Sequence, residues 1–371
     1  MTFLSKKVRI LGRGVPVLAI VIMGAVLVSA ALIAYFGQIT GSVTVTQGLY
    51  VDGQDYNSAL TYSADMTSFE KLQTTSGHNL TDNSGSDAVV NIVPVCTSSV
   101  TNDCTGIDTS IDTVGLSTTV AEITDADASA VLNSGGVVSL LANKNDGSKS
   151  SEARITIDGA DVGVNTLSQL STVSWHVDNG VGYAPHLDVY LDVNKDGVWT
   201  KGDDDVLVFE VAKMDNTNCD DNSTYPIGTF ITSIGGTSYA WLDSGIAGDC
   251  STPDFQSSYD SLANWKTKVS DTTTYNYDGI VARTETINGD TPVLRMELEV
   301  DGWGQMHDET QLSSADVSNV EVNGNAVTMS ELTNPVTVPA HGSQPFYINS
   351  VFPKLLTPET YTITTTVNPT P

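Results

Sequence analysis

Residues 187–211 read Leu-Asp-Val-Tyr-Leu-Asp-Val-Asn-Lys-Asp-Gly-Val-Trp-Thr-Lys-Gly-Asp-Asp-Asp-Val-Leu-Val-Phe-Glu-Val. The first part, Leu187–Leu191, alternates apolar and polar residues, and the last part, Val206–Val211, is mostly apolar. Both patterns are typical of strands and not of helices. The Asp, Asn and Gly residues between them favour a turn. The segment therefore predicts a β-hairpin with a long polar loop.

The loop Asp192–Asp203 has the residue spacing of a calcium-binding loop. Calcium takes about six to eight oxygen ligands, and Gly197 stands at the sixth position, where such loops turn sharply. The predicted ligands are Asp192, Asn194, Asp196, the carbonyl of Val198, Thr200 and Asp203. An Asp at the twelfth position departs from sensor EF-hands and resembles the loops of dockerins. We therefore predict a bound Ca²⁺ that fastens the hairpin; the alternative is a solvated turn.

Short alternating runs separated by turn dipeptides recur along the chain, as at Asp52-Gly53 and Asn323-Gly324. The predicted strands are Ser42–Val51, Val89–Val95, Val137–Leu141, Ala153–Ile157, Val173–Val177, Leu187–Val193, Val206–Val211, Tyr239–Leu242, Ile280–Thr286, Val293–Val300, Val317–Val322, Val336–Val338, Phe346–Val351 and Tyr361–Val367. So many short strands favour sandwiches over one barrel. One helix is expected, with Thr252 as its cap and with Phe255, Tyr259, Leu262 and Trp265 on one face.

Tryptophan distinguishes the middle of the chain from its ends. Residues 41–120 and 305–371 are rich in Thr and lack Trp, whereas four of the five Trp lie between residues 175 and 265. The fold class we predict is all-β, with two jelly-roll-like β-sandwich domains that follow an N-terminal hydrophobic signal helix. Residues 35–125 plus 305–371 form the outer domain, and residues 126–304 form a second domain inserted into it.

The N-terminus has the features of an export signal. Four basic residues precede a nearly unbroken apolar run over residues 15–36; they are Lys6, Lys7, Arg9 and Arg13. We predict a signal peptide over residues 1–34 and a secreted protein at the cell surface. The apolar run is also long enough to span a bilayer, so an uncleaved membrane anchor is the alternative.

The chain is strongly acidic, with 16 basic residues, 44 acidic residues and a net charge of −28. Removing the four basic residues of the signal leaves 12 − 44 = −32. Such a surface repels nucleic acid and anionic lipid, and it suits solubility and divalent cations. Nucleic-acid binding is therefore excluded as a function.

Four cysteines in an exported chain predict two disulfides. Proximity in sequence favours Cys96–Cys104 and Cys219–Cys250, and the other two connectivities stay open. Asn79-Leu80-Thr81 and Asn222-Ser223-Thr224 are N-glycosylation sequons, which make Asn79 and Asn222 candidate acceptors.

No catalytic motif stands out. The five histidines show no metal-ligand spacing and are expected to be surface or satisfied core residues: His78, His176, His186, His307 and His341. Glu297 and Glu299 share a strand face with Arg295, which is typical of a solvent-facing strand. A glycosidase would need a partner carboxylate about 5–10 Å away across a cleft. Three tryptophans are candidates for a sugar-stacking platform, with core packing as the favoured alternative: Trp175, Trp199 and Trp241.

Two segments at the ends of the chain resemble one family. Gly41-Ser42-Val43-Thr44-Val45-Thr46-Gln47-Gly48-Leu49-Tyr50-Val51 is similar to the mature N-terminus of TasA/camelysin-type proteins and archaeal bundling-pilus subunits. The segments His78–Asn83, Ala88–Ile92, Pro335–Ser343 and Thr357–Ile363 resemble later strands and turns of that family. The middle of the chain, about residues 150–303, resembles a jelly-roll module of secreted surface proteins, some of which bind carbohydrate.

The family resemblance implies a filament built by donor-strand exchange. A mature N-terminal strand leaves its own subunit and completes the sheet of the next one. Here Val43, Val45, Leu49 and Val51 would face inward; the alternative is that the strand pairs within its own domain. The first hypothesis is therefore a non-enzymatic structural subunit of an extracellular filament or matrix. The second is a monomeric or anchored surface protein that binds glycans, and a secreted hydrolase ranks third.

Overall fold

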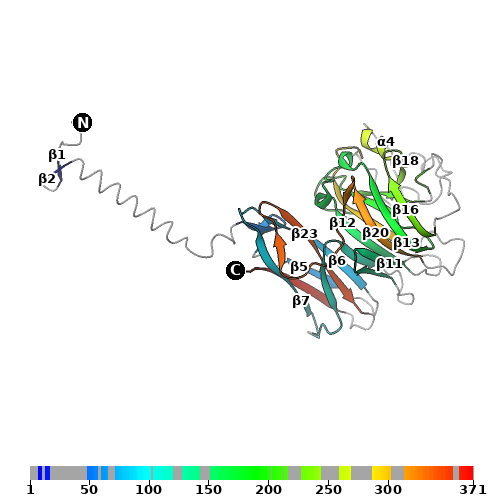
Figure 1. Ribbon diagram of the computed structural model, residues 1–371, viewed down its shortest axis with the longest axis horizontal. Coiled ribbons are helices and arrows are strands. Elements are labelled where there is room, and N and C mark those ends of the chain that lie inside the picture. The colour runs from blue at the N-terminus through cyan, green and yellow to red at the C-terminus, as the bar shows by residue number, and fades with distance from the viewer. Residues whose placement is uncertain are drawn as a thin grey trace.

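The computed structural model describes residues 7–10, 13–16, 48–56, 60–65, 72–101, 103–119, 128–142, 151–201, 203–211, 213–215, 227–243, 259–268, 286–301, 313–353 and 359–370. These residues form antiparallel sheets and a few short helical turns, so the predicted all-β class is confirmed. Figure 1 shows the strands from β3 onward gathered in two neighbouring groups, with β1 and β2 apart from them.

The longest sheet has 12 strands and includes strands of both groups. The order of its ten main strands is β18 (Tyr259–Ser261), β17 (Tyr239–Leu242), β15 (Asp205–Phe209), β14 (His186–Leu191), β19 (Val293–Asp301), β12 (Glu152–Asp158), β9 (Gly115–Thr119), β6 (Leu72–Asp82), β23 (Ser343–Phe352) and β8 (Asp108–Asp112). The other two strands are β3 (Leu49–Val51), which pairs with β6, and β4 (Gln54–Asp55), which pairs with β3.

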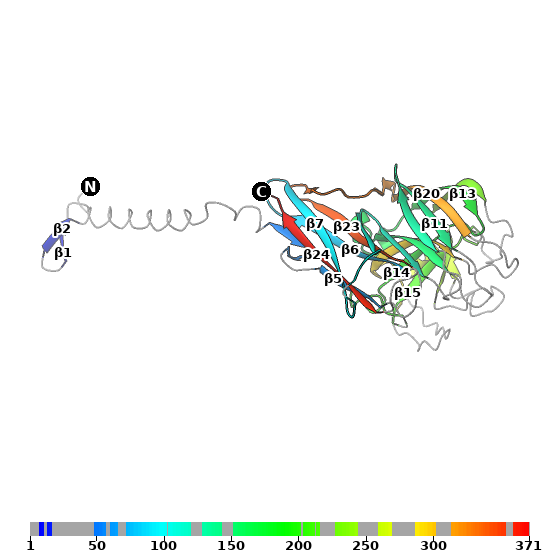
Figure 2. The same ribbon diagram turned by 90° about the horizontal axis from the view of Figure 1, so that it is seen from below.

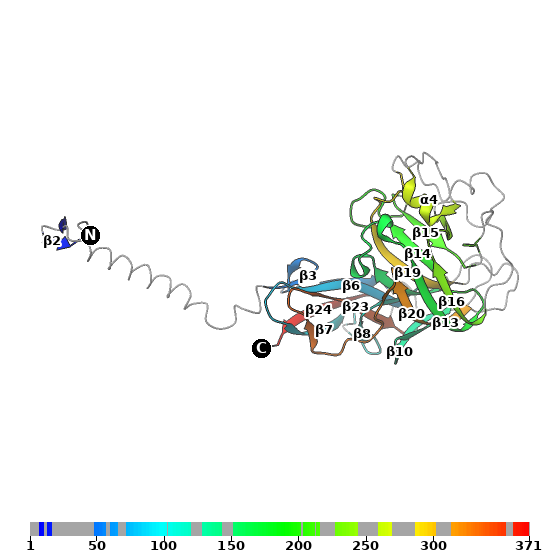
Figure 3. The ribbon, with the colours of Figure 1, turned by 45° about the horizontal axis from the view of Figure 1, so that its top comes forward.

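Two shorter sheets pack against different halves of the long sheet (Figure 3). The six-stranded sheet has the order β10 (Ser129–Asn133), β11 (Val137–Ala142), β20 (Ser313–Val322), β13 (Val173–Val181) and β16 (Gly228–Ile234), with β21 (Asn325–Ala326) beside β20. The four-stranded sheet has the order β22 (Val336–Val338), β7 (Ala88–Ser98), β24 (Thr360–Pro369) and β5 (Leu60–Asp65). The remaining elements are the hairpin β1 (Lys7–Ile10) and β2 (Arg13–Pro16), the 3₁₀ turns η1 (Ala160–Val162) and η2 (Leu167–Gln169), and α4 (Leu262–Thr267).

Two hydrophobic cores lie between these layers. The larger core, which runs from Val114 to Met329 in sequence, fills the space under the six-stranded sheet and includes the fully buried Trp175 and Trp265. The smaller core joins the four-stranded sheet to β3, β6 and β23. Apolar residues on alternate strand positions fill both cores, which is how a period of two buries one face of a strand. Figure 2 shows β5, β7 and β24 on the side of the smaller core and β11, β13 and β20 on the other.

The larger core includes residues from both sides of the predicted domain boundaries. Strand β20 was placed in the outer domain by the boundary at residue 305, but Val317 and Val320 lie in the larger core. Val114 and Leu116, before the boundary at 125, also lie there. The division into an outer and an inserted domain stays a prediction.

The predicted helix agrees with the structure only at its C-terminal end. Tyr259 belongs to β18, and α4 begins at Leu262, where the side chain of Ser261 accepts a hydrogen bond from the backbone of Asn264. Ser261 is thus the N-cap in place of Thr252, which lies outside the described residues. Leu262 and Trp265 do share the buried face of this short helix.

Candidate functional site

The loop after β14 is held by carboxylates that accept backbone N–H groups. Asp192 accepts from Asp196 (3.1 Å) and Gly197 (2.9 Å), and Asp196 accepts from Val198 (2.8 Å). Gly197 has φ +85°, a conformation that glycine adopts at little cost. The loop is therefore preformed with its acidic side chains turned inward.

Asp204, which follows the predicted ligand Asp203, lies beside the other loop carboxylates, and the role of Asp203 stays a prediction. Carboxylate oxygens of Asp192, Asp196 and Asp204 lie within 4.8 Å of one another, as in a group that could hold a metal ion. Asp204 is buried and accepts N–H groups from Val193 (2.7 Å) and Thr200 (2.7 Å), whereas Asp203 is exposed. Among the other predicted ligands, Asn194 lies beside Asp196, whose N–H it accepts at 3.0 Å. The identity of the ion as calcium stays a proposal.

Trp199, at the eighth loop position, attaches the loop to the sheet. Its ring makes an edge contact with Tyr190, with centroids 5.3 Å apart. The Arg295 guanidinium lies over both rings, at 3.7 Å from the Tyr190 centroid and 5.9 Å from that of Trp199. Such cation–π contacts fix the loop against β14 and β19.

A second group of polar residues lies on the face of β12, β14 and β19 that is turned away from the larger core. We call it the polar face; it consists of Glu152, Arg154, His186, Asp188, Tyr190, Arg295, Glu297, Glu299 and Asp301. Glu297 and Glu299 are only 5% and 4% exposed, so the expectation of a solvent-facing strand was wrong. Strand alternation predicts which side chains share a face, but it does not predict what covers that face.

The strand register brings opposite charges together on the polar face. Glu299 is paired with Arg154 on β12 and with His186 on β14. The Arg154 Nε lies 2.5 Å from Glu299 Oε2 and 3.5 Å from Glu297 Oε2, and the guanidinium also contacts Glu152. His186 Nε2 lies 3.5 Å from Asp188 Oδ1. The side chains of Glu297, Glu299 and Asp188 thus belong to one face of one sheet and do not face one another across a cleft.

Burial and charge act in opposite directions on these groups. Burial lowers the pKa of His186, but the negative charges of Asp188, Asp301 and Glu299 outweigh it and raise that pKa to about 9. Burial raises the pKa of Asp188 well above its usual range, and His186 opposes this. Burial lowers the pKa of Arg154, whereas Glu299 and Glu297 raise it, with a net increase. The polar face therefore favours bound positive charge.

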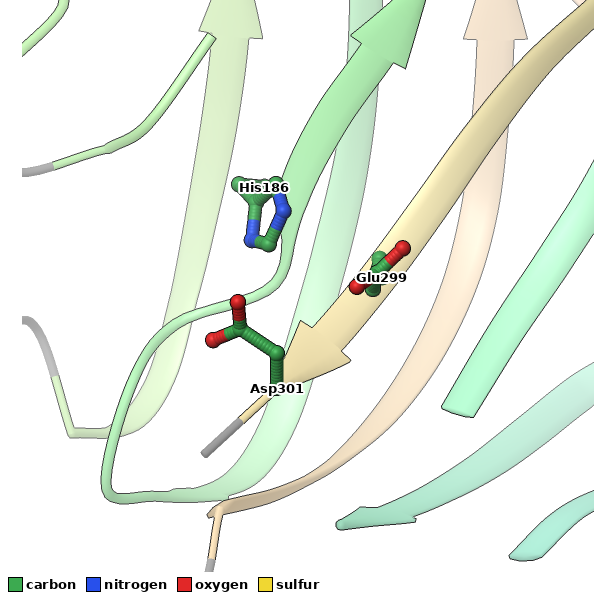
Figure 4. A group of neighbouring side chains, drawn as sticks. All are labelled: His186, Glu299 and Asp301. Carbon is green, nitrogen blue, oxygen red and sulfur yellow. The ribbon is translucent and has the colours of Figure 1, made fainter. Parts of the chain in front are cut away.

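His186, Glu299 and Asp301 form the second group that could hold a metal ion, with ligand atoms within 4.8 Å of one another. Figure 4 shows the His186 ring, at the start of β14, and the Asp301 carboxylate, at the end of β19, turned toward each other. Sequence reasoning missed this group because it considered each histidine by itself. The signal in the sequence was the pattern His-x-Asp at residues 186–188 and the pattern Glu-x-Glu-x-Asp at residues 297–301, on two strands that pair with each other.

Two of the three candidate sugar-binding tryptophans, Trp175 and Trp241, differ in their environments. Trp175 is fully buried in the larger core, so it belongs to the core-packing alternative. Trp241 is partly exposed, and the Lys213 ammonium lies 5.2 Å from its ring centroid. Tyr239 and Tyr259 stack beside it with centroids 5.1 Å apart. Trp241 therefore remains a candidate contact, and Trp175 does not.

The disulfide Cys96–Cys104 is present, as predicted. Cys219 and Cys250 lie outside the described residues, so their pairing stays a prediction, and so does glycosylation at Asn222. Asn79 is half-buried on β6, and its Nδ2 is 3.4 Å from Asp161 Oδ1. A glycan on Asn79 would have to displace that contact.

The described part of the candidate donor strand is β3. Its residues Leu49 and Val51 are buried in the smaller core and pair with Asp82 and Leu80 of β6 in the same chain. This is the intramolecular alternative for the end of the segment. Val43 and Val45, like residues 17–36 of the apolar run, lie outside the described residues. None of the helices described for this chain is long and apolar enough to cross a membrane.

Comparison with family models gives no match for this chain. Comparisons with curated proteins and with solved structures give no match either. The function of this chain is therefore inferred from its residues and their geometry.

Proposed function

We propose that this chain is a secreted, non-enzymatic structural protein, a subunit of an extracellular filament or surface matrix. In this proposal, subunits assemble by donor-strand complementation, and calcium and disulfides stabilise each subunit. The proposal retains the resemblance of the chain ends to TasA/camelysin-type and bundling-pilus proteins.

The observation that carries the proposal is the edge formed by β5. This strand ends the four-stranded sheet, and no described strand pairs with its outer side. Leu60 and Tyr62 on β5 pack against the smaller core and stay partly exposed. An unpaired strand edge beside half-covered apolar side chains is a template for an additional strand. A donor strand with inward-facing Val43 and Val45 would cover both.

The position of β3 restricts which residues can be exchanged. Leu49 and Val51 are in the smaller core of their own chain, so only residues 41–47 are available to a neighbour. Gly48 lies between the two parts, and a Cβ there would lie 2.9 Å from Ser84. We infer that Gly48 is the point where the chain leaves its own subunit.

The test is to compare inward and outward positions of the same strand. Val43→Asp together with Val45→Asp should abolish polymers, because both charges would be buried against the acceptor sheet. The matched control, Thr44→Asp with Thr46→Asp, adds the same charges on the outward side and should still polymerise. Equal polymer yields from both double variants, counted by electron microscopy, would exclude donor-strand assembly through this segment.

A second candidate function is glycan binding through the aromatic cluster Tyr239, Trp241 and Tyr259. The partly exposed Trp241 ring next to two stacked tyrosines is the observation in its favour. Aromatic faces bind the apolar faces of sugars. Trp241→Ala should then reduce retention on polysaccharide gels, whereas Phe230→Ala, on the opposite sheet, should not. Equal retention of both variants and the wild type would eliminate this function.

A further inference from the structure

Among its described side chains, the polar face has more carboxylates than cationic groups. Its described side chains include five carboxylates, namely Glu152, Asp188, Glu297, Glu299 and Asp301, against Arg154, Arg295 and His186. Burying uncompensated charge is costly unless the group is paired or coordinates a metal. A bound cation would therefore reduce the repulsion among these carboxylates.

Two buried carboxylate oxygens on this face lack any hydrogen-bond partner. Glu297 is 5% exposed, and its Oε2 accepts no hydrogen bond. This oxygen lies 3.5 Å from the Arg154 Nε, which is also 2.5 Å from Glu299 Oε2. Asp188 Oδ1 is likewise buried without a hydrogen bond, 3.5 Å from the His186 ring. Buried polar atoms in native proteins normally have hydrogen-bond partners, and a bound ion can take the place of such a partner.

The donor set determines the class of ion. His186, Glu299 and Asp301 offer one nitrogen and two oxygens, all within 4.8 Å of one another (Figure 4). Imidazole and carboxylate together suit zinc and similar first-row metals, whereas calcium prefers oxygen alone. A carboxylate next to a metal-bound imidazole fixes its tautomer and orientation, which is the position of Asp188.

We propose that His186, Glu299 and Asp301 bind a divalent transition-metal ion of the zinc class, separate from the ion of the loop after β14. This ion would join β14 to β19 in the middle of the long sheet and would balance the charge of Glu297 and Asp188. The proposal does not depend on filament assembly, and the two can fail separately.

The test uses the exported protein, stripped with a chelator and then dialysed against Zn²⁺. The background variant Asp192→Ala/Asp196→Ala removes the acidic loop as a competing site. In this background we expect one tightly held zinc per chain by elemental analysis. His186→Gln should abolish it, while His176→Gln should not, because His176 pairs with Asp178 on the other sheet. Asp188→Asn should weaken zinc binding by about 10- to 100-fold, as outer-shell changes do.

A second variant protects the test against misfolding. Asp301→Asn keeps the shape of a partly exposed side chain, so its circular dichroism spectrum in chelator should match the wild type. Cobalt provides a spectroscopic probe, because bound Co²⁺ gives visible bands that depend on its ligands. Loss of these bands in Asp301→Asn supports the site. No zinc uptake in the loop background, or uptake that neither His186→Gln nor Asp301→Asn reduces, would overturn it.

Discussion

Asp192 and Asp204 hold the loop between β14 and β15 from opposite ends. Each carboxylate accepts two or more backbone N–H groups, which orients its oxygens before an ion arrives. Asp196 adds a third carboxylate within 4.8 Å, and three such charges repel one another when no cation is bound. At the residue scale, the loop is therefore ordered by hydrogen bonds, and a bound cation would reduce the repulsion among its carboxylates.

Calcium bound at this loop should stabilise the folded chain. Asp192→Ala with Asp196→Ala should remove the increase in melting temperature that calcium produces in the wild type. At about 100 times its Kd, a ligand stabilises the folded state by about 2.7 kcal/mol, and that is the contribution at stake. Asp203→Ala is the control, because this exposed carboxylate lies outside the group. Calcium-induced stabilisation that survives in the double variant would rule out a structural ion here.

Asp161 provides a pH-dependent contact at the same scale. Burial raises its pKa to about 6, with a further contribution from the negative Asp158, while a hydrogen bond from Tyr347 opposes the increase. A carboxyl with a raised pKa in the folded state stabilises the fold below its unfolded pKa of about 4. That contribution is lost as the pH rises through about 6.

Asp161→Asn should therefore change the pH dependence of stability. The neutral amide still accepts from Tyr347, so its melting temperature relative to wild type should be higher at about pH 7.5 than at about pH 5. Asp55→Asn, an exposed carboxylate on β4, is the control. The same difference between Asp161→Asn and wild type at both pH values would show that Asp161 is not the titrating group.

Among the elements, the end of β7 is cross-linked to the turn that follows it. Cys96 and Cys104 are separated by 8 positions, and a loop of that length gives about 2–3 kcal/mol of stabilisation in the chain-entropy model. Cys96→Ser with Cys104→Ser should lower the free energy of unfolding by that amount in urea titrations. An unchanged midpoint would mean that the pairing of β7 with β24 already holds this region.

Strands with an apolar alternation, including the Thr-rich β24, could be predicted from sequence, whereas the more polar β6 could not. β17 and β22 have the predicted bounds, because Ala240 and Leu242, and Val336 and Val338, alternate with outward residues. β6 was missed, since most of its eleven residues are polar and its main-chain pairing with β23 does not depend on side-chain hydrophobicity. Strand pairing over a long sequence separation leaves little local trace.

The candidate site could be predicted only where it has a local sequence pattern. The loop between β14 and β15 has a local sequence signature, so its position could be predicted, and the structure adds Asp204 to the carboxylates of the loop. The polar face has no local signature. His186 and Glu299 are more than one hundred residues apart in sequence and become neighbours only through the pairing of β14 with β19. The register of that pairing could not be read from either strand alone.

At the scale of the whole molecule, one sheet connects two cores. The connection between β6 and β9 is narrow, with Gln73 opposite Thr118, and the side chain of Gln73 adds hydrogen bonds to Ala130. Tyr347 adds a second contact, since its hydroxyl accepts from the backbone of Asp158 and donates to Asp161. We infer that the two halves act as one subunit, with the β5 edge left for a neighbour.

Electron microscopy of the protein without residues 1–34, purified under denaturing conditions and refolded with calcium, tests the central claim most directly. The account predicts regular filaments in negative stain that resist mild detergent and are absent from the Val43→Asp/Val45→Asp variant. Isolated particles at high protein concentration, with calcium present and the wild-type N-terminal strand intact, would contradict it.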